Sequence, residues 1–262
     1  MRPLHLVGSF ARASLQKDLA YRANFWISLL HSVINLGVGI FSLQILFHQT
    51  ETIRGWNQAQ ALSLLGVYLI ISALRGLFIG PSLDALAGIG QEIWSGNFDF
   101  SLLKPVPVQF LVSIRFWNFY ALLDLLFGMG VLAFAIHQAN HIIVINLLLF
   151  LPALISAVVI LYSLLLAFTA LTFWNPGFLF TWVFDSLFQL ARYPVTIYPA
   201  WLRMILTWVV PVGVMTTIPV QTLHGKIPAG MLGWIILVAG SLLTASSWFF
   251  HCAVKRYSSA SS

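Results

Sequence analysis

Four ionisable or amide side chains lie inside long apolar runs of this sequence, and they are the residues best placed to do chemistry. They are His31, Asn35, Asp124 and Asp185. A charged or strongly polar group in such surroundings is costly, and it often belongs to an ion or substrate path. The same groups can instead join helices through hydrogen bonds worth about 0.6–2 kcal/mol each. For Asp124 and for the helical face shared by His31 and Asn35 we favour the second role.

Motifs that would indicate catalysis or metal binding are missing from the sequence. It has no GxxxxGK[ST] loop for nucleotide phosphates, no HExxH pair for zinc and no GxSxG nucleophile turn. The single cysteine, Cys252, allows no internal disulfide and gives too few thiolates for a cysteine-based metal site. His137 and His141 are four residues apart, but they fall in a short polar loop that favours solvated histidines. The sequence therefore predicts a chain that is not an enzyme and has no metal site.

The composition explains why polar groups are so few. Of the 262 residues, 60% are hydrophobic and 8% are charged, and the mean hydropathy is +0.91. A soluble domain usually carries about 25% charged residues, so much of this surface is expected to be covered by lipid. The formal net charge of +6 fits basic loops beside anionic headgroups. We therefore expect the lipid bilayer as a partner and no nucleic acid.

Long apolar runs predict the helices that cross the bilayer, because a helical span takes about 20 apolar residues. Five runs have that length: 25–47, 59–79, 110–136, 142–172 and 229–251. The second run is expected to end at Gly80 and Pro81. One more span is expected between residues 174 and 226. The sequence thus predicts an all-α polytopic membrane protein with six transmembrane helices in a single transmembrane domain, residues 1–262.

The stretch 174–226 contains two apolar pieces, 178–190 and 201–220, and it is interrupted by prolines. Proline inside a helix removes a hydrogen bond and kinks the helix, and broken backbone at membrane depth must be covered by protein or water. We therefore interpret 178–190 as the fifth span and 191–226 as a re-entrant hairpin at the outer face. Charge counting favours the alternative in which 201–220 is the span, because two more arginines then lie inside.

Basic residues also predict the orientation. With the N-terminus inside, nine of the 13 Lys and Arg residues lie at or near the cytoplasmic face, as the positive-inside rule favours. These nine are Arg2, Arg12, Lys17, Arg22, Arg75, Lys104, Arg115, Lys255 and Arg256. Six spans place the C-terminus inside as well. Arg75 is expected to reach the headgroups from its span. Apolar residues at helical spacing in residues 1–22 predict an amphipathic helix on the inner leaflet.

The loop between the second and third spans, residues 88–108, offers a surface to a partner. It contains an apolar and acidic stretch, a turn at Gly96, and a short apolar helix that ends at Lys104 and Pro105. A segment of this kind can lie along the membrane face and form a docking ridge for a cytoplasmic protein.

Two patterns in the sequence resemble permease subunits of ABC-2 type exporters. The first, I-x-x-G-x-x-D-x-x-L-L-K-P-V, is formed by Ile93, Gly96, Asp99, Leu102, Leu103, Lys104, Pro105 and Val106. The second includes Tyr193, Pro194, Tyr198, Pro199, Arg203, Pro211 and Pro219. Both stand at the matching places of a six-span subfamily of about this length, and the resemblance covers nearly the whole chain. Phe100 departs from the pattern, since many relatives carry a smaller aliphatic residue there.

The resemblance implies a transport subunit without ATPase activity of its own. Two permeases, identical or homologous, would pair, and each would dock a separate nucleotide-binding ATPase that holds ATP and Mg²⁺. The first pattern would be the coupling helix that fits this ATPase. The second would form re-entrant helices that gate the outer exit of the path. The resemblance also implies export across the plasma (inner) membrane of a bacterium.

The main alternative is an ion-coupled secondary transporter that works without an ATPase and uses Asp124 or Asp185 as its ion site. Inverted repeats would favour that function, and the sequence shows no repeat. A membrane enzyme acting on lipids is disfavoured, because no nucleophile, base and oxyanion donor occur together. A membrane anchor that transports nothing is a further alternative.

Overall fold

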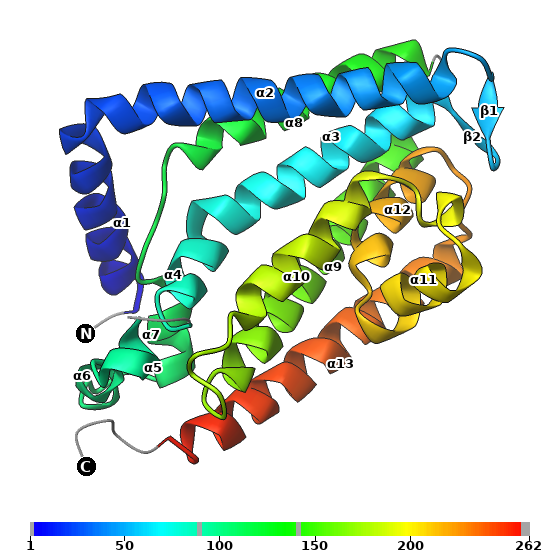
Figure 1. The fold of residues 1–262 in the computed structure, drawn as a ribbon. Coiled ribbons are helices and arrows are strands. Elements are labelled where there is room, and N and C mark those ends of the chain that lie inside the picture. Colours follow the sequence, from blue (N-terminus) through cyan, green and yellow to red (C-terminus); the bar gives the residue numbers. More distant parts are fainter. Residues whose placement is uncertain (1–2, 88–90, 140–142, 258–262) are drawn as a thin grey trace.

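The computed structural model describes residues 3–87, 91–139 and 143–257, which form an assembly of helices with one short hairpin of strands (Figure 1). The long helices are α1 (Pro3–Ala20), α2 (Arg22–Phe47), α3 (Gln58–Leu74), α8 (Ala121–Gln138), α9 (Val144–Leu171) and α13 (Ala229–Val254). The shorter ones are α4 (Gly80–Asp84), α5 (Glu92–Ser95), α6 (Phe98–Leu102), α7 (Val108–Ile114), α10 (Phe180–Gln189), α11 (Ala200–Met204) and α12 (Val212–Leu223). The predicted all-α class is confirmed.

The described residues also include four helical turns that are wider or tighter than an α-helix, and two short strands. The turns η1 (Arg75–Ile79) and η4 (Ile205–Val209) are π-helical. The turns η2 (Leu190–Arg192) and η3 (Val195–Ile197) are 3₁₀-helical. Strand β1 (Thr52–Ile53) pairs antiparallel with β2 (Trp56–Asn57).

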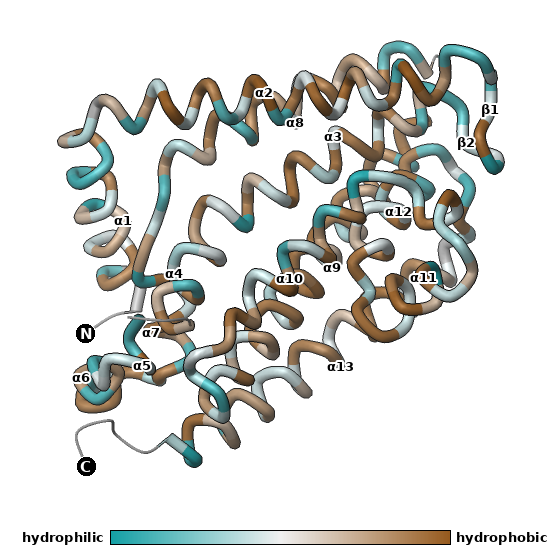
Figure 2. The backbone as a smooth tube through the Cα atoms, in the orientation of Figure 1, coloured by the Kyte–Doolittle hydropathy of each residue, from teal (hydrophilic) through white to brown (hydrophobic). Residues whose placement is uncertain are grey.

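Within the described residues, five helices are long and apolar enough to cross a membrane. They cover Ala23–Phe47, Gln58–Asp84, Ala121–Gln138, Val144–Leu171 and Gly230–Val254. Hydrophobic residues dominate these helices, whereas hydrophilic residues gather in α1, in the strand hairpin and in the connecting loops (Figure 2). The expected polytopic membrane protein is therefore confirmed.

The prediction that Gly80 and Pro81 end the second span is wrong. The helix continues through the π-turn η1, where the Gly80 N–H donates to the carbonyl of Arg75, and then through α4. Pro81 lies in the first turn of α4 and has no N–H to give, and the carbonyl of Leu77, four residues before it, accepts the Asn118 N–H instead. A proline that looks like a stop signal is thus accommodated by one wide turn just before it.

The prediction of an unbroken third span over 110–136 is also wrong. Helix α7 ends at Ile114, and α8 begins only at Ala121. The backbone amides of residues 116–120 are satisfied instead by the hydroxyls of Ser82 and Ser14, the carbonyl of Leu77, and the side chains of Asp18 and Asn118. The apolar composition of this segment could not reveal partners that are supplied by α1 and α4.

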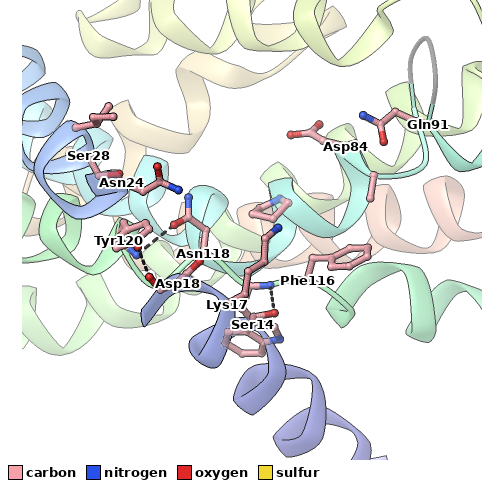
Figure 3. Close-up of a pocket in the computed structure, with 14 residues that line it drawn as sticks. Ser14, Lys17, Asp18, Asn24, Ser28, Asp84, Gln91, Phe116, Asn118 and Tyr120 are labelled. Atoms are coloured by element: carbon pink, nitrogen blue, oxygen red, sulfur yellow. Dashed lines mark hydrogen bonds between the residues drawn. The ribbon is translucent and has the colours of Figure 1, made fainter. Parts of the chain in front are cut away.

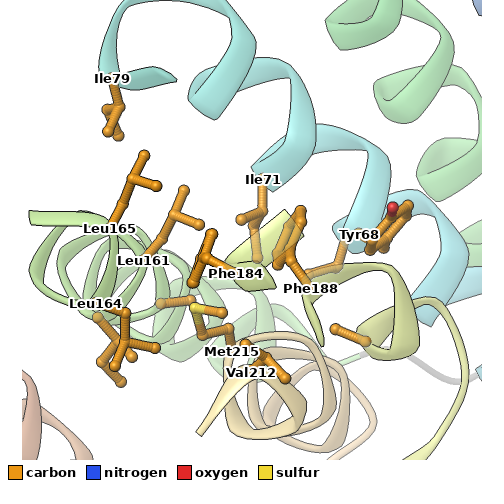
Figure 4. Packing of buried hydrophobic residues seen from close by; sticks show 14 of the residues in the cluster. Tyr68, Ile71, Ile79, Leu161, Leu164, Leu165, Phe184, Phe188, Val212 and Met215 are labelled. Carbon is orange, nitrogen blue, oxygen red and sulfur yellow. The ribbon is translucent and has the colours of Figure 1, made fainter. Parts of the chain in front are cut away.

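Helix α3 lies at the centre of the packing, against α8, α9 and α12. Ile71 on α3, Leu165 on α9 and Met215 on α12 are fully buried around the aromatic rings of α10 (Figure 4). Because lipid tails are as apolar as these side chains, close van der Waals contact rather than escape from water holds the helices together. Small residues make that contact possible: Gly128 on α8 lies directly against the backbone of Ile70.

The segment from α9 to α13 passes once from one end of the molecule to the other. At one end Trp174 stacks on Phe249 near the C-terminus of α13, with ring centroids 5.3 Å apart. At the other end Lys226 donates to the carbonyl of Gly55 over 3.2 Å. Helix α10 lies along this passage (Figure 1), but ten residues rise only about 15 Å, roughly half a bilayer core.

Residues 201–220 do not form a straight span. Two helical pieces cover this stretch, Ala200–Val209 and Val212–Leu223. They are long and apolar enough for a span only when taken together, and their axes meet at an angle of 87°. Pro211 stands at the bend, where a proline cannot continue the preceding helix. The chain therefore folds back on itself at the end of the molecule that carries the strand hairpin.

A matched pair of glycines on α8 tests the close packing of α3 and α8. In Gly128→Ala the new Cβ would lie 2.9 Å from the backbone nitrogen of Ile70, and overpacking of this kind costs about 1–3 kcal/mol. In Gly130→Ala the new Cβ meets nothing within 4 Å, and the better helix propensity of alanine is expected to raise stability slightly. Thermal melting in detergent should show a lower midpoint for Gly128→Ala alone. Equal midpoints for the two variants would contradict this packing.

Candidate functional site

The loop 91–107 folds into two short helices joined by a glycine turn. Helix α5 ends at Gly96, whose φ of 76° lies in the left-handed region that only glycine adopts at little cost. Helix α6 follows at once. The predicted glycine turn and short helix are thus present, whereas residues 88–90 of the predicted loop lie outside the described residues.

Aromatic contacts fix this loop to the ends of two spans. Phe98 on α6 is fully buried, and its ring lies 5.3 Å from that of Phe173, just after α9, and 5.1 Å from that of Tyr257, just after α13. Ile93 on α5 is buried as well. A displacement of α6 would therefore move the ends of both α9 and α13.

A polar contact links the same loop to the segment after α7. Arg115 forms an ion pair with Glu92, which also accepts a hydrogen bond of 3.2 Å from the Ser101 hydroxyl. All three side chains are largely shielded from solvent. The two short helices are thereby held in a fixed orientation.

The outward face of the loop is an apolar ridge formed by Trp94, Phe100, Leu102 and Leu103. Leu103 is 81% exposed and Phe100 is 68% exposed. Lys104 and Pro105 are exposed beside the ridge. Large apolar side chains held outward by a rigid anchor are typical of a protein interface.

The residues predicted for partner docking divide into two groups. Leu102, Leu103, Lys104 and Pro105 are exposed, whereas Ile93 points into the core and Asp99 is half-buried. The sequence analysis missed the exposed Trp94 and the anchor Phe98. Phe98 and Phe100 are two residues apart on one short helix, and composition alone cannot say which of them faces inward.

A charged cluster joins the second span to α10. Arg75 at the start of η1 is 2.6 Å from Asp185 and 3.5 Å from Asp84, with side-chain exposures of 17%, 35% and 41% respectively. That Arg75 can reach the headgroups stays a prediction; within the protein, carboxylates from α10 and α4 pair with it. The π-turn starts at this arginine, and such turns often mark functional sites.

A second polar contact ties the far end of α10 to α2 and α3. Arg192 donates to the Oδ1 of Asn35, and its guanidinium lies over the ring of Tyr68, 5.2 Å from the centroid. Asn35 on α2 is thereby joined to η2. His31, one turn earlier on α2, is exposed.

Asp124 does not lie in the middle of a span, contrary to the sequence prediction. It stands in the first turn of α8, half-buried, where the helix dipole stabilises a negative charge. No other described residue forms a hydrogen bond or ion pair with its side chain. Its position follows from the break at residues 115–120, which the sequence did not reveal.

The predicted outer-gate residues lie in the folded-back segment 191–226. The Tyr198 hydroxyl donates to the carbonyl of Leu190 over 2.9 Å, and Arg203 donates to the carbonyls of Thr196 and Tyr198. Pro194 and Pro211 are buried, Tyr193 is half-buried, and Pro199 is exposed. The Tyr198 and Arg203 side chains thus bond carbonyls that the broken helices leave without a partner. The folded-back segment is therefore held in a defined conformation by its own hydrogen bonds.

The far end of this segment is attached to the start of α3. His224 shares a hydrogen bond of 3.0 Å with the Ser63 hydroxyl. Burial and the nearby Lys226 lower the pKa of His224, so the neutral imidazole is favoured. Lys226 donates to Gln60 over 2.9 Å as well as to Gly55.

Comparison with known proteins identifies the family. The model of the family described as ABC-2 family transporter protein matches residues 33–261. This chain belongs to the ABC-2 transporter family. No curated protein and no solved structure matches it. As an ABC-2 protein it is a multi-pass transmembrane transport subunit, which agrees with the resemblance drawn from the sequence.

The charged cluster of this ABC-2 protein can be tested with a matched pair of aspartates. Asp185→Asn removes a carboxylate from Arg75, and hydrogen bonds to charged groups contribute about 1.5–3 kcal/mol. Asp124→Asn changes the same chemical group where no ion pair is present. We expect a lower melting temperature in detergent for Asp185→Asn and little change for Asp124→Asn. The opposite order would show that the ion pair does not stabilise the fold.

The attachment of His224 predicts a pH dependence. Because folding lowers the pKa of His224 below its ordinary value of 6.5, its contribution to stability is present above that value and is lost as the pH falls through the lowered pKa. Melting temperatures measured from about pH 8 to about pH 5 should fall less steeply for His224→Gln than for the wild type. His48→Gln, at an exposed histidine, is the control and should follow the wild type. Parallel curves for all three proteins would refute the prediction.

Proposed function

We propose that this chain is the transmembrane permease subunit of an ATP-driven exporter, docked through its exposed loop ridge to a separate ATPase. ATP and Mg²⁺ would bind that ATPase, not this chain. Membership of the ABC-2 family supports a transport subunit. The observation that carries the ATPase docking is the ridge around Phe100 and Leu103, held outward by the buried Phe98.

The geometry of the loop suits the transmission of motion. Its ridge faces away from the spans, while its anchor contacts the ends of α9 and α13. A partner that grips the ridge and moves would therefore pull on two spans at once. The predicted coupling residues Gly96, Asp99 and Leu103 do not all act in the same way, since the glycine sets the turn and the leucine offers contact area.

A second permease, identical or homologous, is part of the proposal. Asp84 and Asp185 belong to spans or lie between them, yet each carboxylate is more than a third exposed in the single chain. Charged groups in spans almost always face the interior of a bundle or a water-filled cavity, because lipid does not solvate them. A second permease against α2 and α10 would cover this surface and enclose a path between the two chains.

The orientation follows from the basic residues. Helix α1 is bonded to the segment 116–120, the loop 91–107 contacts Tyr257 just after α13, and these parts lie at one end of the molecule (Figure 1). We place this end in the cytoplasm of a bacterium, with both termini inside and the protein in the plasma membrane. Helix α10 with η2 then provides the fifth crossing, and the segment 191–226, with Tyr193, Pro199 and Arg203, closes the outer exit.

Copurification tests the proposed docking. The double substitution Phe100→Ser with Leu103→Ser removes the centre of the ridge without touching the anchor. Loss of interface anchors costs about 2 kcal/mol or more, so we expect at least about tenfold less ATPase to copurify in mild detergent. Wild-type protein isolated from native membranes is the reference, with the ATPase subunit identified by mass spectrometry.

Ile143→Ser is the matched control, since Ile143 is an exposed apolar residue at the opposite end of α9. It should retain the ATPase. Wild-type protein that purifies without any ATPase or second permease would overturn the proposal and favour the ion-coupled secondary transporter. Equal loss in the control would assign the effect to general destabilisation and would also reject the ridge as the docking surface.

A further inference from the structure

A cavity of about 610 Å³ opens where α1 meets the ends of the spans (Figure 3). Four chain segments surround it: α1, the start of α2, α4 with the residues that follow it, and the broken segment before α8. Its volume falls within the range of small-molecule and headgroup sites, about 300–1,000 Å³. The proposed ATPase docking does not use this cavity, and of its lining residues Asp84 also belongs to the surface proposed for the second permease.

The wall formed by residues 116–120 is rigid although it is not helical. The Trp117 N–H donates to the Ser14 hydroxyl over 3.1 Å, and the Phe119 N–H donates to the carboxylate of Asp18 over 2.9 Å. The Tyr120 hydroxyl donates to the carbonyl of Asp18. These bonds hold α1 at a fixed distance from the start of α8. The shape of the cavity between them is therefore defined by hydrogen bonds.

Several polar side chains that line the cavity have no partner within the described part of the chain. Lys17, Asn24, Ser28 and Gln91 line it, and no hydrogen bond or ion pair joins their side chains to another described residue. Figure 3 shows the amide groups of Asn24 and Asn118 directed toward one another, with Lys17 on the other side of Asn118. Unused donors and acceptors from separate segments that converge on one space are the usual composition of a polar ligand site.

The charges in the cavity have two signs. On α1 Lys17 supplies a cation, and the neighbouring Asp18 supplies a carboxylate that already accepts the Phe119 N–H. Asp84 lines the opposite wall, and one oxygen of its carboxylate is buried without a hydrogen-bond partner. Arg75 is shared between Asp84 and Asp185, which leaves this wall with a net negative charge. A ligand with an anionic and a cationic group complements Lys17, whose side chain has no described partner, and the open carboxylate oxygen of Asp84.

The cavity lies at the level of lipid headgroups. Three spans begin or end beside it, at Ala23, Asp84 and Ala121. Trp117 and Tyr120 stand at the same level, as aromatic residues do at the membrane interface. Apolar side chains, Ile27 and Phe116, border the opening. This placement holds whichever face of the membrane the cavity occupies.

We propose that this cavity binds the headgroup of a phospholipid that carries a phosphate and a primary ammonium group, the chemistry of phosphatidylethanolamine. The phosphate is held by Lys17 and the amides of Asn24 and Asn118. The ammonium donates its hydrogen bonds to Asp84 and Gln91, while the acyl chains leave past Ile27 into the bilayer. The bound lipid fixes α1 to the start of α2 and to the segment before α8. The inference does not depend on the proposed ATPase.

Lipid titration tests the proposal. Purified, delipidated full-length protein is titrated with dioleoyl phosphatidylethanolamine, phosphatidylcholine or phosphatidylglycerol, and native mass spectrometry measures the apparent Kd of the first bound lipid. Phosphatidylcholine keeps the phosphate but its quaternary ammonium donates no hydrogen bond, and phosphatidylglycerol lacks the cation. We expect phosphatidylethanolamine to bind about tenfold more tightly than either, the factor that one charge-assisted hydrogen bond supplies.

Variants assign that binding to the cavity. Lys17→Gln should weaken binding of phosphatidylethanolamine by about tenfold. Arg12→Gln is the matched control, because it removes the same charge from an exposed position of α1 outside the cavity lining, and it should bind as the wild type does. Asn24→Leu is a second cavity variant with unchanged charge, and it keeps the test valid if Lys17→Gln does not fold.

Three outcomes would overturn the proposal. Equal affinity for the three lipids would reject the ammonium site. If Lys17→Gln and Arg12→Gln weaken phosphatidylethanolamine binding equally, the effect comes from the surface charge in general and not from the cavity. Binding of soluble glycerophosphoethanolamine as tightly as of the lipid would assign the cavity to a water-soluble phosphate ester instead.

Discussion

Backbone polar groups within a bilayer must find their partners inside the protein, and the rest of this structure depends on how that constraint is met. The long helices meet it internally. Where the chain departs from a regular helix, specific side chains supply what the helix no longer does. Ser14, Asp18 and Ser82 satisfy the amides of residues 116–120. Tyr198 and Arg203 satisfy carbonyls of the folded-back segment. The segment 116–120 is therefore tied to distant parts of the sequence. The folded-back segment is held by its own side chains and is tied to α3 and to the strand hairpin through His224 and Lys226.

Helix α10 is the element that connects these parts. Near its middle Asp185 pairs with Arg75, which begins the π-turn that leads into α4 and on to the loop 91–107. Beyond its end Arg192 reaches Asn35 on α2 and the ring of Tyr68 on α3. The buried rings of Phe184 and Phe188 pack α10 into the core, and the charged contacts tie it to two spans as well. In the proposed exporter this makes α10 the link between the docking loop on one side and the hairpin on the other.

The two surfaces that carry our proposals differ in chemistry and in location on the fold. The ridge around Phe100 and Leu103 is apolar, projects beyond the span ends and suits a protein partner. The cavity beside α1 is polar, carries both signs of charge and lies level with the span ends, which suits a lipid headgroup. They are close in the fold, because Gln91 lines the cavity and begins the loop that carries the ridge. A lipid bound in the cavity and a protein bound on the ridge would therefore act on neighbouring segments.

Composition and periodicity by themselves determined that this is an all-α polytopic membrane protein. They also indicated the approximate place of most spans, and two short motifs carried the glycine turn at Gly96 and the resemblance to the family that the comparison then identified. Hydrophobic length and short motifs are local properties. Only the tertiary structure decided where helices continue or break. Pro81 is tolerated because the π-turn before it absorbs the change, and the third span breaks because α1 and α4 offer partners for its amides. The pairing of Arg75 with Asp185, the inward position of Phe98 and the cavity at Lys17 each depend on residues far apart in the chain. A hydropathy pattern records how apolar a segment is, but it does not record which distant side chain will satisfy a polar group.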